Sequence, residues 1–215
     1  MCTANYYRRD SDLDNYRNIN KYPLNQFAGK VLLLNAPPGA GKDYAAMRIS
    51  YALGCKGSSF KEPMFEIAKA ITGLTHEEFF NIYNDRDKKE LPQPEFHGLS
   101  PRALMIWISE DVIKPKFGND FFGAASANAC NPETGTVFSD SGFASEVFPL
   151  AHRFGAENIY VCQFTRNGKV FGESDSREYL KASELPEGVN FLPFMENDGC
   201  IQAFTNKITD YVMTY

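Results

Sequence analysis

The sequence has no apolar stretch long enough to form a membrane-spanning helix. Its first residues, which include Arg8, Arg9, Asp10 and Asp12, also lack the apolar core of a secretion signal. The 5 cysteines are an odd number, are widely spaced and form no C-x-x-C pair, so they support neither a disulfide framework nor a zinc site. These absences predict a cytoplasmic protein with reduced thiols and no membrane partner.

Positive charge is also in short supply. The 22 Lys and Arg residues are outnumbered by 27 Asp and Glu residues, which gives a formal net charge of −5 and a pI of about 5.3. This balance argues against a nucleic acid or an anionic membrane as the partner, because both attract a basic surface. It does not exclude a small anionic substrate, since a local basic cleft does not require a basic protein.

The length of 215 residues suits one α/β domain with an insertion or a lid. Residues 1–28 show little periodicity and are expected to form an N-terminal extension, either a loosely packed arm or an arm that wraps the second subunit of a homodimer. Patterning predicts strands at 30–35, 55–60, 136–139, 158–164 and 189–194, and helices at 41–53, 61–72, 76–84, 101–113, 119–129, 143–154 and 199–213. This alternation predicts a three-layer α/β/α fold around a mostly parallel five-stranded sheet.

Local signals fix the starts of two of these helices. Thr75 followed by Glu78 is a capping-box pattern, and Ser100-Pro101 pairs an N-cap with a proline at the first helical position. The helix at 101–113 is then expected to bury one face, made of Leu104, Ile108 and Val112.

The clearest chemical signal lies at residues 31–48. Four apolar residues precede a turn rich in Pro and Gly, and a helix-forming segment follows. This is the strand–loop–helix context of a phosphate-binding P-loop, in which backbone N–H groups and the positive end of the helix face a phosphate. Ala36 stands where the motif has its first glycine, and Asp43 where it has Ser or Thr. We expect Lys42 to reach the β- and γ-phosphates of a nucleotide that contacts Pro38, Gly39, Ala40, Gly41, Lys42, Asp43 and Tyr44.

Two aspartates are candidates for Mg²⁺. Asp140 ends the strand at 136–139, at the sheet edge where parallel α/β sheets bind ligands, and is expected to hold the ion directly or through water. Its alternative role is to cap the helix at 143–154. Asp43 would be repelled by phosphates unless a cation lies between them, so it either supports Mg²⁺ from further out or stabilises the N-terminus of its helix.

Residues 165–185 are charged, contain glycines and are poorly periodic. Arg166 and Arg177 flank a stretch that contains Gly168 and Gly172 as candidate hinges. We expect a lid whose arginines close on a transferring phosphoryl group, with an exposed hairpin of ordinary surface charge as the alternative. A phosphate loop, an acid and arginines at one sheet edge together suit phosphoryl transfer.

From about residue 30 onward, the chain resembles the deoxynucleoside monophosphate kinases of tailed bacteriophages. The similar segments occur in the family's order: Gly-Lys-Asp at 41–43, Phe-Lys-Glu-Pro-Met at 60–64, and the runs at 85–89, 100–105, 111–113, 140–146 and 197–199. Two departures concern base specificity and leave it open. Gly142 stands where the family has Arg, and Ile106, Ser109 and Glu110 replace the family's Gln and Gly-Thr.

The resemblance implies a P-loop NTPase fold at residues 29–215, with a helical nucleoside-monophosphate-binding insertion at about 60–130 and a lid at about 165–185. It implies ATP- and Mg²⁺-dependent phosphorylation of a deoxynucleoside monophosphate to the diphosphate, in the host cytoplasm if the gene is a phage gene. By this resemblance Arg86, Lys88 and Arg102 hold the acceptor monophosphate, and Lys61 is also expected at the acceptor. Asp140 and Glu146 are expected near the acceptor nucleotide or Mg²⁺, and catalysis uses Lys42, Asp140, Arg166 and Arg177.

Two other functions stay open. The substitutions at positions 36, 43, 142 and 106–110 also suit a degenerate kinase that binds nucleotide and acts on a host protein through its N-terminal arm. A P-loop kinase with another phosphorylated acceptor, such as a mevalonate or coenzyme A precursor, is the third hypothesis. An ADP-release assay with a panel of acceptors separates them.

Overall fold

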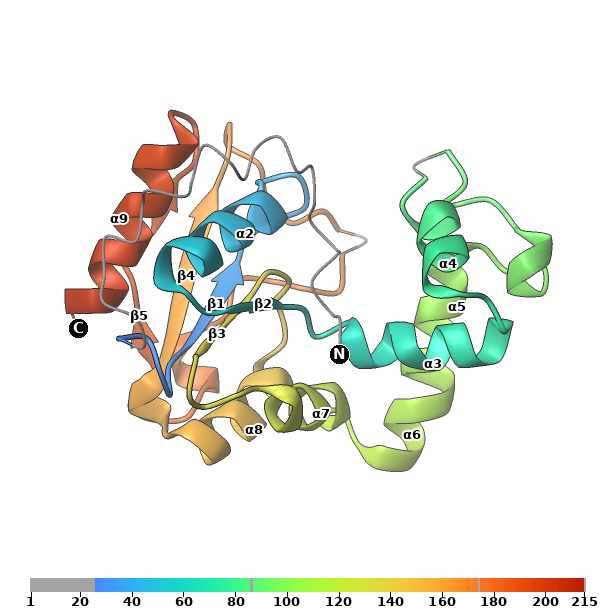
Figure 1. Ribbon diagram of the computed structural model, residues 1–215, viewed down its shortest axis with the longest axis horizontal. Helices are drawn as coiled ribbons and strands as arrows, with labels where there is room; N and C mark the ends of the chain where they lie inside the picture. The colour runs from blue at the N-terminus through green and yellow to red at the C-terminus, as the bar shows by residue number, and fades with distance from the viewer. Residues whose placement is uncertain (1–25, 86, 174, 215) are drawn as a thin grey trace.

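The computed structural model describes residues 26–85, 87–173 and 175–214, which form an α/β part and a helical arm (Figure 1). The strands of the α/β part are β1 (Val31–Asn35), β2 (Lys56–Ser58), β3 (Thr136–Phe138), β4 (Ile159–Thr165), β5 (Asn190–Phe191) and β6 (Met195–Glu196). Five of them follow the order β2-β3-β1-β4-β5, and β6 pairs with β4. All pairings among the described residues are parallel, so the predicted parallel α/β sheet is confirmed.

The strand predicted at 189–194 is confirmed only for its first part, β5, and a second short strand, β6, follows it. β5 pairs with Tyr160 and Val161 of β4, whereas β6 pairs with Phe164 and Thr165. Pro193 lies between them and has no N–H to donate to a ladder, so the pairing is interrupted there. Within the described part of the chain, the sheet therefore has six strands rather than the expected five.

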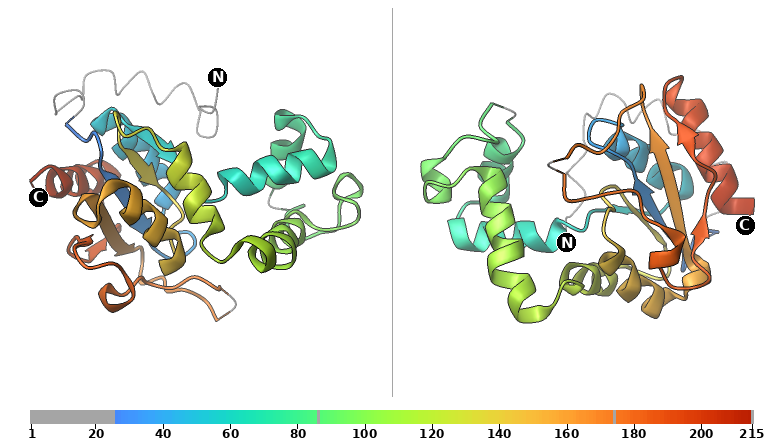
Figure 2. Two further views of the ribbon diagram at one scale, coloured as in Figure 1. Left: turned by 90° about the horizontal axis from the view of Figure 1, so that it is seen from below. Right: turned by 180° about the vertical axis from the view of Figure 1, so that it is seen from behind.

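Helices cover both faces of the sheet (Figure 2). On one face lie α2 (Lys42–Leu53) and α9 (Ile201–Thr214), and on the other lie α7 (Phe121–Ala129) and α8 (Ala144–Phe154). The helical arm holds α3 (Glu62–Thr72), α4 (His76–Tyr83), α5 (Pro101–Ile106) and α6 (Lys114–Phe117). Leu32 and Leu34 of β1 pack with α2 and α9, whereas Val31 and Leu33 pack with α7 and α8. The alternation of side chains along one strand thus builds two cores, which gives the expected three layers.

Phe27 extends the first of these cores. It is 1% exposed and packs in the cluster of α2 and α9, although the sequence assigned it to the N-terminal extension. Residues 1–25 of that extension lie outside the described part of the chain, so the proposed arm and the homodimer stay predictions.

The helical arm has a third core of its own. Aromatic side chains dominate it, among them Phe65, Phe79, Phe80, Phe96 and Phe122. The predicted caps are confirmed: Thr75 and Glu78 form a capping box, and the Ser100 Oγ accepts a hydrogen bond of 3.1 Å from the Ala103 N–H. The arm projects from the α/β part in Figure 1 and has its own apolar cluster, which α7 joins to the core under the sheet through Phe122 and Ala127.

One helix of the arm differs from its prediction. The segment expected as a single α-helix at 101–113 is α-helical only to Ile106, π-helical from Trp107 to Ile113, and α-helical again in α6. A π-turn adds a residue, so the buried face continues from Ile108 to Ile113 and leaves Val112 37% exposed. The prediction that Val112 is buried is wrong for this reason.

Candidate active site

The site begins at the carboxyl end of β1. The segment at 36–41, called here the 36–41 loop, joins β1 to α2, and Gly39 and Gly41 adopt positive φ angles of 75° and 89°. Among the described non-glycine residues, only His97 and Asn167 have a positive φ. Ala36 therefore lies in a backbone conformation that does not require glycine, which explains why Ala is tolerated at the first position of the motif.

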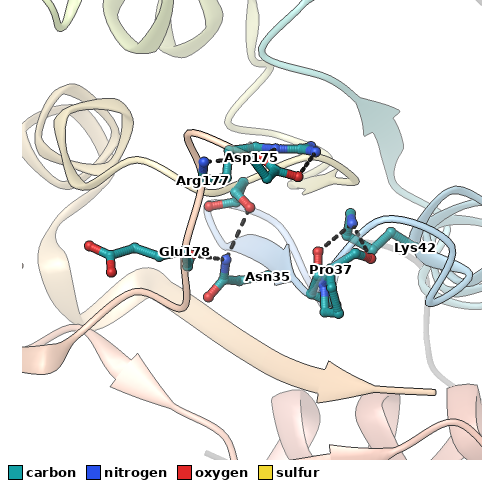
Figure 3. Close-up of polar contacts among 8 residues, drawn as sticks. Asn35, Pro37, Lys42, Asp175, Arg177 and Glu178 are labelled. Atoms are coloured by element: carbon teal, nitrogen blue, oxygen red, sulfur yellow. Dashed lines mark hydrogen bonds and ion pairs between the residues drawn. The ribbon is translucent and has the colours of Figure 1, made fainter. Parts of the chain in front are cut away.

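Lys42 is the first residue of α2 and is buried. Its Nζ donates hydrogen bonds to the carbonyl of Pro37, at 2.9 Å, and to that of Ala36 (Figure 3). Burial, followed by the positive charge of Arg177, lowers the pKa of Lys42 to about 8. The ammonium is thus held against the inside of its own loop, where a cation is costly without an anionic partner.

Asp43 and Tyr44 follow Lys42 in the first turn of α2, and both are exposed. The carboxylate of Asp43 raises the pKa of Lys42, an effect weaker than the opposing effects of burial and Arg177. Its place in the first turn suits the helix dipole. Support of Mg²⁺ is compatible with the same position, so the two roles expected for Asp43 both stay open.

Asp140 lies at the carboxyl end of β3, beside β1, and is buried. Its Oδ2 accepts a hydrogen bond of 2.6 Å from the Ser59 hydroxyl, and its Oδ1 accepts one of 2.9 Å from the Phe60 N–H. α8 begins at Ala144 with Phe143 as its N-cap residue, so Asp140 does not cap it as the alternative reading expected. The carboxylate instead joins β3 to the segment that enters α3.

The two arginines expected in a lid, Arg166 and Arg177, approach the 36–41 loop from different segments. Arg166 follows β4, and one of its terminal nitrogens lies 3.8 Å from the point where a Cβ on Gly41 would be. Arg177 forms a two-point ion pair with Asp175, with distances of 2.9 and 2.8 Å (Figure 3). This pairing raises the pKa of Arg177. The structure therefore brings both arginines close to the end of the 36–41 loop, where Lys42 begins α2.

A cleft of about 490 Å³ lies between the 36–41 loop and the helical arm. That volume is in the range of small-molecule sites. Charged side chains from both parts of the fold line it: Lys61, Lys89, Arg102, Lys114, Arg177, Glu110, Asp140, Glu146 and Asp175. The remaining wall is largely apolar and aromatic, with Phe60, Met64, Tyr83, Met105, Ile106, Phe122 and Phe143.

Most of the predicted acceptor-binding residues line this cleft. Lys61, Arg102, Asp140 and Glu146 are part of its wall, and Arg86 lies outside the described residues. Lys88 is not part of the wall and forms an exposed ion pair with Asp85 at 3.2 Å. The neighbouring Lys89 lines the cleft instead, and burial, followed by the charges of Lys61 and Arg102, lowers its pKa.

Glu146 is a second buried carboxyl group of the cleft wall, beside Asp140. Its Oε2 accepts a 3.4 Å hydrogen bond from the Phe143 N–H at the start of α8. Burial and the adjacent charge of Asp140 raise the pKa of Glu146 to about 8. α7 packs closely at this position, because a Cβ on Gly123 would lie 2.7 Å from the Glu146 backbone.

Two polar residues near the loop were missed in the sequence. Lys169 Nζ lies 3.3 Å from the Gly39 carbonyl, and the amide of Asn35 is completely buried at the end of β1. Asn197, which the resemblance included without a role, donates a 2.9 Å hydrogen bond to the Ala40 carbonyl. Only the position of Asn35 at the end of an apolar strand was a usable signal, since polar residues at such ends often face a ligand site.

No helix among the described residues is long and apolar enough to cross a membrane. No protein-family model matches the chain. Over 81 residues it is 28% identical to a protein of Acanthamoeba polyphaga mimivirus described as "Putative deoxynucleotide monophosphate kinase". The similar segment spans 38% of this chain and 40% of the viral protein. The partial similarity points to a kinase-like family, and the parallel α/β sheet with its covering helices fits a nucleotide-kinase-like fold.

Proposed function

We propose that the protein transfers the γ-phosphate of ATP to a deoxynucleoside monophosphate, giving ADP and the deoxynucleoside diphosphate. The observation that carries this proposal is the series of cations along the cleft: Lys61, Lys89, Arg102 and Arg177 line it, and Lys42 follows the loop that borders it. Lys61 lies close enough to Lys42 and Lys89 to lower the pKa of both. Arg177 adds to this effect at Lys42, and Arg102 at Lys89. Like charges held together cost free energy that bound anions relieve, which favours two phosphorylated substrates at this place.

The donor would bind at the 36–41 loop. Its phosphates would meet the loop N–H groups and the N-terminus of α2, a 12-residue helix. Lys42 would exchange its bonds to the loop carbonyls for the β- and γ-phosphates, and Arg166, beside Gly41, would add a second positive charge.

The acceptor would bind in the part of the cleft that faces the helical arm. Lys61, Lys89 and Arg102 supply the charge for its monophosphate, and the aromatic wall offers Tyr83, Phe122 and Phe143 for a sugar and a base. An acceptor phosphate is already ionised at neutral pH, so the reaction needs no general base. Charge neutralisation by Lys42 and Arg177 is the main catalytic requirement.

The cleft also suits Mg²⁺ that enters with ATP. No cluster of three or more His, Cys, Asp or Glu side chains suited to a metal occurs in the described ranges. Each oxygen of Asp140 accepts one hydrogen bond and keeps a lone pair, and Asp43 is exposed beside Lys42. These carboxylates fit an ion held mainly by phosphate and water, whose charge would offset that of the phosphates.

The test is an ADP-release assay with ATP, Mg²⁺ and each of the four common deoxynucleoside monophosphates. We expect turnover with at least one acceptor, and a loss of kcat of about 100-fold or more in Lys42→Ala, as for other preorganised cations. Lys207→Ala is the matched control, because Lys207 is an exposed lysine on α9. ATP binding without turnover on any acceptor would favour the degenerate nucleotide-binding hypothesis. Turnover only with other phosphorylated metabolites would favour a different kinase.

A further inference from the structure

The amide side chain of Asn35 makes four hydrogen bonds at the carboxyl end of β1. Its Nδ2 donates to the Ser141 carbonyl at 3.1 Å and to the Glu178 carbonyl at 2.9 Å. Its Oδ1 accepts from the Leu180 N–H at 2.8 Å and from the Gln163 side chain at 2.9 Å. Two donors and two acceptor lone pairs are all that an amide offers, so this side chain is fully used within the protein.

These four bonds join segments that are far apart in the sequence. Ser141 follows β3, Gln163 belongs to β4, and Glu178 and Leu180 belong to the segment that returns from the lid. Gln163 reinforces the arrangement, because its Nε2 also donates to the Leu180 carbonyl at 2.7 Å. Asn35 therefore fixes the returning segment at two backbone positions, directly after Arg177.

Arg177 lines the cleft from the segment that Asn35 holds at the end of β1. Figure 3 shows Asp175 and Arg177 on the same side of β1 as Lys42, with Asn35 bonded to the chain that carries them. The stem of Arg177 runs over Gly142, where a Cβ would lie 2.6 Å from both the Cβ and the Cγ of the arginine. The guanidinium is close enough to Lys42 to lower the pKa of that lysine.

We infer that Asn35 is a positioning residue of the proposed kinase, and that it acts by holding Arg177 at the phosphoryl-transfer end of the cleft. The inference rests on the proposed function for its consequence in catalysis. It predicts that loss of the amide misplaces Arg177 and lowers kcat, while binding of ATP at the 36–41 loop is largely kept. A purely structural role would lower stability without depending on Arg177.

The decisive experiment is a double-mutant cycle of Asn35→Ala and Arg177→Ala, with kcat and KM measured for ATP. We expect Asn35→Ala to lower kcat by about 10- to 100-fold, the scale of a 1 Å misplacement of a catalytic group. In the Arg177→Ala background, the same change should lower kcat by less than about threefold, because the group it positions is gone. Equal losses in both backgrounds, or no loss in Arg177→Ala alone, would overturn the inference.

Two further variants keep the test decisive if Asn35→Ala folds poorly. Gln163→Met removes the bonds of Gln163 to Asn35 and Leu180 at similar volume, and should show a smaller loss of kcat with the same dependence on Arg177. Asn190→Ala is the control, because its amide also donates to two carbonyls, those of Glu157 and Ile159, at the amino end of β4. A loss of kcat in Asn190→Ala as large as in the other variants would mean that a general loss of stability of the fold explains the effect.

Hydrogen exchange separates this inference from the proposed function. The Leu180 amide should exchange at least about tenfold faster in Asn35→Ala than in the wild type, because its bond to Oδ1 is lost. It should be unchanged in Asn190→Ala. If the wild type turns over no acceptor, the proposed function fails, yet faster exchange would still support the positioning of this segment by Asn35. Unchanged exchange would refute it.

Discussion

Glu146→Gln should remove a pH dependence of stability that the buried carboxyl group imposes. The pKa of Glu146 is about 8 in the folded protein, against a reference value of 4.5. Between these values the folded state holds a proton that the unfolded state releases, so the free energy of unfolding falls as pH rises. The difference of about 3.5 pH units, at about 1.36 kcal/mol per unit, sets an upper limit of about 5 kcal/mol.

The local geometry supports this substitution. Glutamine is nearly isosteric with a protonated glutamate, and its amide oxygen still accepts the hydrogen bond from the Phe143 N–H. The Glu146 backbone also packs closely against Gly123 of α7. At pH 5 the two proteins should therefore be similar in stability. At pH 9 the variant should be more stable by roughly 2–5 kcal/mol, on the scale of buried carboxylates.

Urea unfolding followed by circular dichroism at pH 5, 7 and 9 measures this difference. Effects of titrating groups that do not interact with Glu146 are common to both proteins and cancel in the comparison. Asp140 does interact with Glu146, so its contribution is part of the measured difference. Glu187→Gln, at an exposed position, should differ from the wild type by less than about 0.5 kcal/mol at each pH. A stability difference for Glu146→Gln that is constant from pH 5 to 9, or that changes in the opposite direction, would refute the reasoning.

Two further predictions concern the proposed donor site. Lys42 loses its proton as pH rises through about 8, so kcat/KM for ATP should fall above that pH, whereas Lys42→Arg should not show this fall. Initial rates from pH 6 to 10 measure both proteins, and a flat wild-type profile would contradict the role of Lys42. Lys169→Ala should raise KM for ATP by roughly three- to tenfold with kcat nearly unchanged, because Lys169 lies over the Gly39 carbonyl as an exposed charge. The rise in KM should be smaller in high salt, and a KM equal to that of Lys207→Ala would contradict the prediction.

The elements that the sequence predicted well are those with strong local signals. The capping box of Thr75 and Glu78 and the N-cap of Ser100 depend on residues three positions apart, so the sequence contains both partners. The π-helix from Trp107 to Ile113 has no such signal, because its one-residue shift results from packing in the arm. For the same reason, a loop without periodicity could not show that Lys89 rather than Lys88 faces the cleft.

The arrangement of the site is harder to predict than its members. Lys42, Asp140 and Arg177 were identified because each follows a strand or flanks glycines, and strand ends of a parallel sheet meet at one edge. The contacts that set their geometry join distant segments: Asn35 bonds Ser141 and Glu178, which lie 106 and 143 positions further along the chain. Such pairs leave no periodic pattern in the sequence, because the hydrogen-bond partners of a buried amide come from several distant segments that only the folded chain brings together.

The hydrogen bonds of Asn35 also bear on how the charged groups of the cleft are held in place. Asn35, at the end of β1, bonds both the loop that follows Asp140 and the segment that follows Arg177, and β1 itself leads into the loop that precedes Lys42. Lys42, Arg177 and Asp140 therefore depend on one strand end for their separation. Because that strand is completely buried, the separation is fixed by the core, and the two substrate sites proposed above would be aligned before either substrate binds.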